Sequence, residues 1–425
     1  MSLSNKVRNY VLKHADQFDV VFWLDSSEHV GKSHIGKYKI LVGLGSKSSI
    51  VLNEANPSDW QVIDDFCANT VWKFITISYD LKNPLHGLKT TNPDTHNWPL
   101  LEIHEPDVVI AVDYDDNLFV EGINKEEIRS SIEHKSDGYH IKVKAQVKVK
   151  EISSAVSRDE YHESVAYIKQ QIREGNMYEM NLCVKHELVR PNIPDPLTLF
   201  QELNTVSPTP FAAFVKSNNR NVLCASPERF LRRSNDVLYS QPIKGTSERL
   251  EDVVANNQSK LHLANSIKER AEHVMIVDLV RNDLSRVCTA GSVQVEELFG
   301  IYEFRQVNQM ISTISGKQEA GTTFTDILRA TFPMGSMTGA PKRIVMEIID
   351  EIETTARGWY SGSIGYIEPN GNFDLNVVIR SLLIDTETNK SSYTVGGAIT
   401  FDSDPEAEFQ ECKLKAKALN KILGF

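Results

Sequence analysis

Two pairs of glutamates share the same three-residue spacing. Glu269 and Glu272 lie in one segment with a helical pattern, and Glu408 and Glu411 lie in another near the end of the sequence. Residues three apart occupy one face of a helix, so the carboxylates of each pair can point the same way. A single such pair is typical of a solvated helix surface. Mg²⁺ is usually held by one or two carboxylates together with an anionic ligand. The repeated spacing therefore predicts a magnesium site that binds a carboxylate substrate, with a solvated surface as the alternative.

A glycine-rich turn occupies residues 332–342. Gly335 and Gly339 precede Pro341, which we expect at the first position of a helix. Such a helix start presents free backbone N–H groups that suit an anion. The segment does not match the nucleotide-binding pattern GxxxxGK[ST], because Lys342 follows a proline and no serine or threonine comes after it. We therefore expect an anion site here and exclude ATP binding.

Two shorter glycine segments and one arginine are further binding candidates. Gly362-Ser363 and Gly397-Ala398 each adjoin an apolar, β-like run. Glycine allows a ligand to approach backbone N–H groups closely, although each segment is equally typical of a plain turn or bulge. Arg380 lies within an apolar run that predicts a strand. Its charge requires a partner, either a protein acid or a substrate carboxylate.

The composition disfavours several classes of function. The 425 residues carry a formal net charge of -11, which disfavours non-specific binding to nucleic acid. No apolar run approaches the roughly 18 residues of a membrane helix, and the first residues lack the apolar core of a signal peptide. The five cysteines are scattered and have no CxxC spacing, which predicts reduced core thiols. We expect a cytoplasmic protein that binds neither nucleic acid nor a membrane.

The elements that carry these residues fall into two predicted parts. Residues 1–150 contain short apolar runs rich in β-forming residues and are expected to form an N-terminal β-rich subdomain. Within them, residues 141–149 alternate apolar and polar side chains and predict an edge strand. Ser157 and Glu160 match a capping box, so a helix should begin there. Residues 157–425 then alternate helical and strand patterns, which predicts one continuous catalytic domain with the N-terminal sheet packed against it.

The motifs of this second part resemble those of the chorismate-utilising enzymes. That family includes anthranilate synthase component I, aminodeoxychorismate synthase component I, isochorismate synthase and salicylate synthase. The resemblance rests on many separate motifs that follow the family's order, which makes chance agreement negligible. They occupy residues 175–183, 226–229, 242–246, 268–273, 278–283, 333–342, 362–366 and 408–411. The resemblance implies an α+β fold of two β-sheet/α-helix layers, like that of anthranilate synthase component I, with the active site in a central cleft.

The same resemblance implies a role for each candidate residue. It places Mg²⁺ on Glu272 and Glu411, with Glu269 and Glu408 beside them. Glu228 would be the general acid that protonates the departing C4 hydroxyl of chorismate, a role that requires a raised pKa near neutral pH. The other expected residues are Gly362, Ser363, Arg380, Gly397, Ala398 and Lys415 for substrate binding, and Glu179, Lys244, Thr246 and His273 for catalysis.

Lys244 distinguishes between members of the family. Its segment, residues 242–246, resembles that of aminodeoxychorismate synthases, whereas anthranilate synthases usually have a small residue at this position. In that subgroup the lysine amine attacks C2 of chorismate, and ammonia then resolves the covalent adduct at C4. The product is 4-amino-4-deoxychorismate, the precursor of p-aminobenzoate in folate synthesis. A protonated lysine is a poor nucleophile, so pairing with a carboxylate would disarm it.

Glu179 departs from the family pattern. Its position is typically Gln in members that use ammonia and Lys in members that use water. The lysine-based water activation of isochorismate and salicylate synthases is therefore absent. A glutamate could accept a hydrogen bond from ammonia or, with a raised pKa, act like the amide of Gln.

These resemblances imply one leading function and three alternatives. The leading one is aminodeoxychorismate synthase component I, supplied with ammonia by a glutamine amidotransferase subunit, because the sequence shows no Cys-His amidotransferase signature. Anthranilate synthase component I is the nearest alternative, and isochorismate synthase is a more distant one. An alternative of another class is a non-catalytic, chorismate-binding regulatory subunit.

Overall fold

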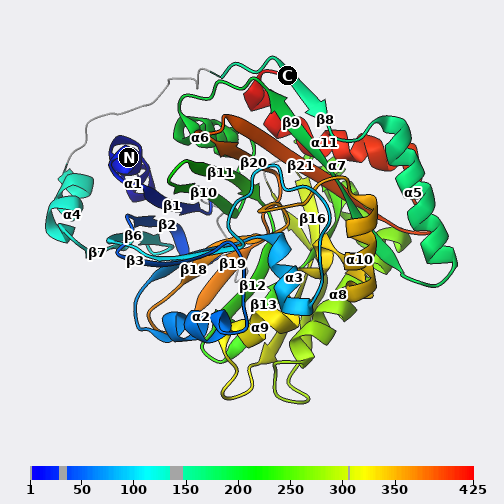
Figure 1. Cartoon of the computed structure of the whole chain (residues 1–425), viewed down its shortest axis with the longest axis horizontal. Coiled ribbons are helices and arrows are strands. Elements are labelled where there is room, and N and C mark those ends of the chain that lie inside the picture. Colours follow the sequence, from blue (N-terminus) through cyan, green and yellow to red (C-terminus); the bar gives the residue numbers. More distant parts are fainter. Residues whose placement is uncertain (1, 28–35, 135–146, 305–306) are drawn as a thin grey trace.

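Strands from distant parts of the sequence pair to form two antiparallel sheets. The computed structural model describes residues 2–27, 36–134, 147–304 and 307–425. In these residues the strands form an 11-stranded sheet, sheet A, and a 10-stranded sheet, sheet B (Figure 1). Sheet A runs in the order β17 (Gly339–Ala340), β9 (Glu179–Val189), β21 (Lys390–Ile399), β20 (Ser381–Asp385), β11 (Arg220–Ser226), β10 (Phe211–Ser217), β1 (Val20–Asp25), β2 (Tyr38–Leu44), β6 (Val108–Asp113) and β7 (Leu118–Gly122), and β8 (Glu151–Ser154) pairs with β9. Sheet B runs in the order β14 (Ile243–Glu248), β16 (Val307–Lys317), β13 (Val237–Gln241), β12 (Arg229–Ser234), β19 (Phe373–Asn376), β18 (Ser363–Ile367), β4 (Lys73–Ile77), β5 (Leu101–Glu105) and β3 (Ser48–Leu52), and β15 (Gln294–Glu303) pairs with β16.

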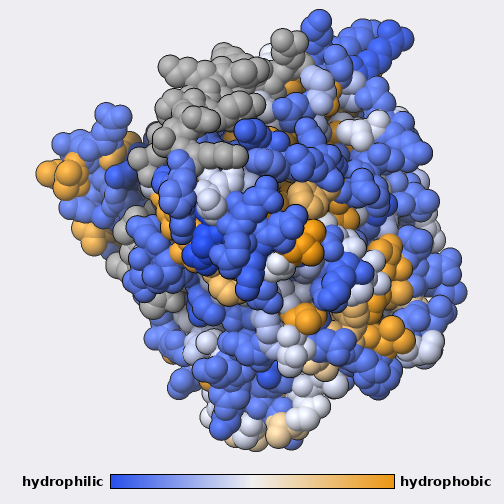
Figure 2. All heavy atoms as spheres, turned by 90° about the vertical axis from the view of Figure 1, so that its left-hand side faces the viewer, coloured by the Kyte–Doolittle hydropathy of each residue, from blue (hydrophilic) through white to orange (hydrophobic). Residues whose placement is uncertain are grey.

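Helices connect these strands. The α-helices are α1 (Leu3–His14), α2 (Asp59–Ala68), α3 (Lys82–His86), α4 (Lys125–His134), α5 (Arg158–Arg173), α6 (Pro196–Val206), α7 (Val253–Asn265), α8 (Ile267–Ser285), α9 (Phe324–Thr331), α10 (Lys342–Ile352) and α11 (Pro405–Leu423). The short helices are η1 (Ala15–Gln17), η2 (Tyr79–Leu81) and η3 (Gly335–Met337). Within the described residues, every helix is too short or too polar to cross a membrane. On the face drawn in Figure 2, hydrophilic residues predominate and hydrophobic ones form smaller patches between them.

The apolar pattern of the strands explains how the two sheets pack. In β1, Val21 and Trp23 belong to the core between sheet A and its helices, whereas Val20 and Phe22 belong to the core between the sheets. A strand that is apolar on both faces is typical of a layer covered on both sides. The ring of Phe22 in sheet A lies 5.3 Å from the ring of Phe74 in sheet B. A third core lies between sheet B and helices such as α2, α8 and α9. The expected α+β fold is therefore confirmed, with helices outside two packed sheets.

The first 150 residues extend both sheets. β1 and β2 belong to sheet A, where β1 pairs with β10, and β4 belongs to sheet B, where it pairs with β18. The β-rich character predicted for this segment is present, but the expected separate N-terminal sheet is not formed, because later strands supply the pairing partners. The division into residues 1–150 and 157–425 stays a prediction about folding units. Most of the predicted edge strand at residues 141–149 lies outside the described residues.

Local sequence signals are confirmed at several elements. Ser157 caps α5 and forms the predicted capping box with Glu160. The segments that carry the glutamate pairs are helical, as α8 and α11. All five cysteines are buried and free, as predicted for core thiols.

A buried ion pair joins β9, η3 and the end of α10. The guanidinium of Arg357 donates to both carboxylate oxygens of Glu353, at 2.9 and 2.6 Å. It also donates to the carbonyl of Met337 in η3 at 2.6 Å and to the carbonyl of Asn181 in β9 at 2.9 Å. Glu353 in turn accepts from the backbone N–H of Cys183 in β9 at 2.9 Å. The pair therefore fixes β9 and η3 relative to the C-terminal end of α10.

We expect Glu353→Ala to lower the free energy of unfolding by about 3–5 kcal/mol, because the substitution leaves the Arg357 charge buried and unpaired. Urea denaturation followed by circular dichroism measures this loss. The matched control is Glu347→Ala in α10, which removes an exposed ion pair with Arg343 (N···O 3.4 Å) and should cost less than about 1 kcal/mol. Equal losses in the two variants would contradict the role assigned to the Arg357–Glu353 pair.

Candidate active site

Two neighbouring crossings between the sheets position Glu228 and Arg380. The chain leaves sheet A at the end of β11 and enters sheet B at β12, and Glu228 lies between these strands. It returns from β19 to β20 through Arg380, whose φ of 52° is left-handed. The backbone N–H of Val377 donates to the carbonyl of Glu228 at 3.1 Å, and that of Ala225 donates to the carbonyl of Arg380 at 3.2 Å. The strand predicted through Arg380 is therefore wrong: the run is apolar because it is buried where it passes from one sheet to the other.

The Glu228 carboxyl is suited to hold a proton near neutral pH. Its residue is 5% exposed. Burial raises its pKa to about 7, although the Ser336 hydroxyl and the charges of Lys244 and Arg380 act in the opposite direction. The guanidinium of Arg380 forms no hydrogen bond or ion pair with any described residue, and burial lowers its pKa while Glu228 opposes that shift. The crossings therefore place an acid that can be protonated beside a cation that can bind a carboxylate.

Lys244 and Glu179 meet across the two sheets. The Lys244 Nζ in β14 of sheet B lies 3.6 Å from the Glu179 Oε1 in β9 of sheet A. Their side chains are 11% and 3% exposed. Burial lowers the pKa of Lys244, but Glu179, Glu272, Glu228 and Glu411 together raise it above its ordinary value. In the absence of substrate Lys244 is therefore an ammonium paired with a carboxylate, the arrangement that disarms a nucleophile.

Glu179 has one carboxylate oxygen without a partner. Burial raises its pKa, and Lys244 lowers it by a smaller amount. Its Oε2 atom is buried and has no hydrogen-bond partner among the described residues. A buried acceptor without a partner is costly and usually has a functional reason.

A bulge in β14 aims Lys244 at this site. Ile243 pairs with Ile311 and Thr246 with Gln309, so β14 has one more residue than β16 between these pairs. Gly245 takes up the extra residue with a φ of 83°, and a Cβ there would lie 2.9 Å from an oxygen of Glu269. Bulges commonly redirect a side chain next to an active site. Glycine is therefore needed both for the backbone conformation and for the approach of α8.

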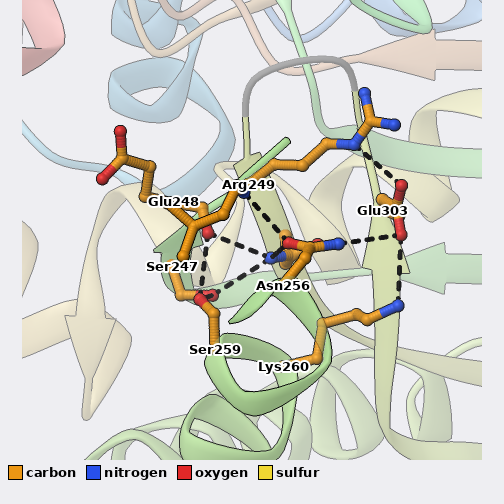
Figure 3. A network of polar contacts seen from close by, with 9 residues as sticks. Ser247, Glu248, Arg249, Asn256, Ser259, Lys260 and Glu303 are labelled. Atoms are coloured by element: carbon orange, nitrogen blue, oxygen red, sulfur yellow. Dashed lines mark hydrogen bonds and ion pairs between the residues drawn. The ribbon is translucent and has the colours of Figure 1, made fainter. Parts of the chain in front are cut away.

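A polar network holds the end of β14 in place (Figure 3). The hydroxyl of Ser259 in α7 donates to the hydroxyl of Ser247 and to the carbonyl of Glu248, each at 2.9 Å. Asn308 in β16 donates to the same carbonyl at 3.2 Å. The carboxylate of Glu303 in β15 holds Arg249 and the Lys260 of α7 at 2.7 and 3.1 Å. These contacts tie the strand that carries Lys244 to α7, to its partner strand β16 and to β15.

The four glutamates of the predicted metal site lie on two helices that face common cations. Lys268 lies 3.9 Å from Glu272 and also lowers the pKa of Glu408 and of Glu411. Burial raises the pKa of Glu272 to about 7, and Glu269 adds to the shift. Burial also raises the pKa of Glu408, whereas at Glu411 the nearby lysines outweigh burial and lower the pKa.

These acids do not form a compact cluster. Among the described residues, no three His, Cys, Asp or Glu side chains lie close enough together to hold a metal ion. A magnesium ion needs only one or two protein carboxylates when a substrate anion and water complete its oxygen ligands. Glu272 and Glu411 both act on the charge of Lys244, so the two helices present them to one region. Hard oxygen donors on two facing elements therefore fit Mg²⁺ together with an anionic substrate.

Lys415 and Gly397 lie beside the acids of α11. The Lys415 Nζ is 2.9 Å from the Glu411 carboxylate and donates to the carbonyl of Gly396 at 2.7 Å. A Cβ at Gly397 would lie 3.4 Å from a Glu408 oxygen and 3.8 Å from the Lys415 Nζ. Ala398 follows in β21. The structure therefore places Gly397 beside Glu408 and Lys415 of α11, with Ala398 next to it in the strand. The part of these residues in substrate binding stays a prediction.

Gly362 and Ser363 have contacts within the core. The backbone N–H of Gly362 donates to the carbonyl of Trp359 at 3.2 Å, and a Cβ there would lie 2.0 Å from the carbonyl of Ile77. The hydroxyl of Ser363 donates to the carbonyl of Asn376 at 2.6 Å. Strand packing is sufficient to explain this glycine, and no described contact links the two residues to Lys244 or the four acids. Their part in substrate binding stays a prediction.

The other predicted catalytic residues occupy different positions around β14. Thr246 is exposed on the strand itself. His273 in α8 is fully buried, with its Nε2 2.7 Å from the Ser312 hydroxyl, and burial lowers its pKa to about 4. The imidazole is therefore neutral at pH 7 and packs behind the strand that carries Lys244. The catalytic roles of both residues stay predictions.

The glycine-rich turn differs from the prediction in detail. Pro341 is the N-cap of α10, one position before the expected one. The Lys342 Nζ lies 2.6 Å from the Asp283 carboxylate and donates to the carbonyl of Thr331 at 2.9 Å, so its charge is already paired. Within the turn, Ser336 acts on Glu228. The sequence had given no reason to single out Ser336, and its place in the resembling motif at residues 333–342 is the one signal that could have identified it.

Comparisons with known proteins identify the family of the chain. Residues 21–421 match the family model described as chorismate binding enzyme. A Salmonella typhimurium protein named aminodeoxychorismate synthase component 1 is 42% identical over 271 residues, which cover 64% of this chain and 58% of that protein. A Synechocystis protein named anthranilate synthase component I-like protein is 33% identical over 344 residues, which cover 81% of this chain and 70% of that protein.

A solved structure shares the fold. Anthranilate synthase component I from Streptococcus pneumoniae superimposes with a TM-score of 0.76 at 22% identity, over 92% of this chain and 94% of that one. At this identity the likeness shows the fold alone. The family match extends through both sheets and includes every residue of the site described above. The chain belongs to the chorismate binding enzyme family.

Proposed function

We propose that this protein is an aminodeoxychorismate synthase component I, which converts chorismate and ammonia to 4-amino-4-deoxychorismate. The observation that carries the proposal is the position of Lys244, a buried amine among carboxylates from β9, α8, α11 and the crossing that holds Glu228. A lysine that acts as a nucleophile needs nearby carboxylates that can accept its proton. The name of the Salmonella relative supports the proposal.

Different residues act at C2 and at C4 of chorismate. Arg380 binds a carboxylate of chorismate, and the Lys244 amine attacks C2. The ring double bonds shift, the C4–O bond breaks, and Glu228 gives its proton to the departing hydroxyl, which leaves as water. Ammonia then attacks C4, and the lysine leaves from C2 as the double bonds shift back. The balance is chorismate plus ammonia giving aminodeoxychorismate plus water.

In the same proposal, Mg²⁺ is held by Glu272 and Glu411, with Glu269 and Glu408 beside them. When bound, the ion supplies positive charge that attracts a substrate carboxylate. Gly397, Ala398 and Lys415 lie at the same end of the site and complete the binding of that carboxylate. The ammonia comes from a glutamine amidotransferase partner, a proposal supported by the words "component 1" in the name of the relative.

We expect the purified chain, supplied with chorismate, ammonia and Mg²⁺, to release 4-amino-4-deoxychorismate as its main product. Mass spectrometry of the products measures this directly. Lys244→Ala should abolish the covalent adduct and leave only slow direct addition of ammonia. Addition at C2 with loss of the C4 hydroxyl as water gives 2-amino-2-deoxyisochorismate, which becomes anthranilate only after pyruvate is eliminated. Anthranilate as the main product of the unaltered chain would instead assign it to the anthranilate synthases. Chorismate binding without any turnover would favour a regulatory subunit.

The rate should depend on pH through Glu228. A general acid must carry its proton, and the pKa of Glu228 is about 7, so activity should be retained below pH 7 and lost as the pH rises through that value. The profile of kcat/KM against pH tests this. Glu228→Gln should lower kcat by about 10²-fold or more and remove this limb of the profile. A limb that stays in place in the variant would assign it to another group.

Removing the metal should abolish activity. Chelation with EDTA is expected to stop turnover, and added Mg²⁺ should restore it, because substrate binding lacks its counter-charge without the ion. Glu272→Gln should raise the Mg²⁺ concentration needed for half-maximal activity. Glu347→Gln, on the exposed face of α10, is the matched control and should leave that concentration unchanged. Full activity in EDTA would contradict the metal site.

A further inference from the structure

We propose that Glu179 is the proton acceptor that converts the Lys244 ammonium into the attacking amine. This inference rests on the proposed function and gives Glu179 a task that a glutamine at the same position could not perform. An amide has no basic site near neutral pH, whereas a carboxylate can take up a proton.

Geometry singles out Glu179 among the acids near Lys244. Of the described residues, it is the one with which Lys244 forms an ion pair, at 3.6 Å. The two groups come from β9 of sheet A and β14 of sheet B, so the packing of the sheets sets their distance. The side chains of Lys244 and Glu179 are only 11% and 3% exposed, so the Glu179 carboxylate is a closer proton acceptor than bulk water. A short movement of the lysine chain is sufficient to close the gap to hydrogen-bond distance.

The acids around Lys244 and the burial of the pair act in opposite directions on this proton transfer. Lys244 faces Glu272 of α8, Glu411 of α11 and Glu228 of the sheet crossing, in addition to Glu179 of β9. These four acids favour the ammonium, so the amine needs an internal acceptor in order to form. Burial works in the opposite direction, since it disfavours both the carboxylate and the ammonium and so favours the neutral pair. In the described parts of the chain, no hydrogen-bond donor contacts the Oε2 of Glu179 and holds the carboxylate in its charged form.

The proton transfer takes place entirely between Lys244 and Glu179. One N–H bond of the Lys244 ammonium breaks, and one O–H bond forms on the Glu179 carboxylate. The total number of protons is unchanged, so a neutral amine and a neutral carboxylic acid replace an ammonium and a carboxylate. The free electron pair of nitrogen then forms the bond to C2 of chorismate, while Glu228 protonates the hydroxyl that leaves C4.

Retention of the proton within the pair has a measurable consequence. In the unaltered protein, the fraction of neutral amine does not depend on pH while the pair holds its single proton. In Glu179→Gln, the amine forms only by losing a proton to solvent, so its fraction rises about tenfold per pH unit below the pKa of the lysine. Glu228 affects both proteins in the same way, so its contribution cancels when the two rates are divided.

The test is the rate of adduct formation at Lys244 after rapid mixing with chorismate and Mg²⁺ in the absence of ammonia. Intact-protein mass spectrometry follows the adduct at intervals between about pH 6 and about pH 8. We expect the ratio of the unaltered rate to the Glu179→Gln rate to fall about tenfold for each pH unit. Glu187→Gln changes an exposed residue of the same strand and should give a ratio near one at every pH. Thermal unfolding and the chorismate dissociation constant of each variant check that fold and binding are retained.

The outcomes separate this inference from the proposed function. A ratio that is constant with pH overturns the role of Glu179 and leaves the lysine adduct in place. An adduct that never forms at Lys244 in the unaltered protein, at any pH, overturns both the adduct mechanism and the role of Glu179. A slower Glu179→Gln variant with a parallel pH profile would assign the residue a structural part and also overturns the inference.

Discussion

The buried pair of Arg357 and Glu353 is the contact on which the geometry of the site depends. Its partners are the backbone of β9, the turn at η3 and the end of α10. β9 carries Glu179, and η3 carries Ser336, the hydroxyl that acts on Glu228. A guanidinium can hold several acceptors in a fixed plane, which a lysine could not do. One ion pair therefore fixes both the strand that carries Glu179 and the turn that carries Ser336.

The acids around Lys244 give the site an excess of negative charge. The acids around Lys244 outnumber the nearby cations Lys268, Lys415 and Arg380. Burial raises the pKa of Glu228 and of Glu272 to about 7, so both lie close to protonation at neutral pH. An incoming carboxylate would meet this negative surface, unless a metal ion or a proton compensates for it. The proposed Mg²⁺ would compensate for this excess of negative charge, whereas the proposed proton transfer within the Lys244–Glu179 pair leaves the net charge unchanged.

The sequence predicts the helices of the site better than it predicts the path of the chain between the sheets. The spacing within α8 and α11 was sufficient to place each glutamate pair on one face, because helical periodicity is a local property. The run through Arg380 shows the opposite case: its apolar residues were consistent with a strand, but they are buried because the chain changes sheets there. The close contact of Gly362 with a neighbouring strand was not predicted either, and its expected approach to a ligand stays a prediction. Such contacts depend on which strands pair, and pairing between distant segments cannot be deduced from local pattern.

The pairing of β4 with β18 joins residues 73–77 to residues 363–367, and β1 joins β10 in the same way. Contacts between segments so far apart require large loops to close before they contribute stability, which makes folding slow. During synthesis, β4 has no β18 partner until most of the chain has left the ribosome, and its apolar edge stays open for that time. Glu411 follows later still, in α11. The order of synthesis thus delays completion of the proposed site until α11 has been made, and apolar strand edges stay exposed until then.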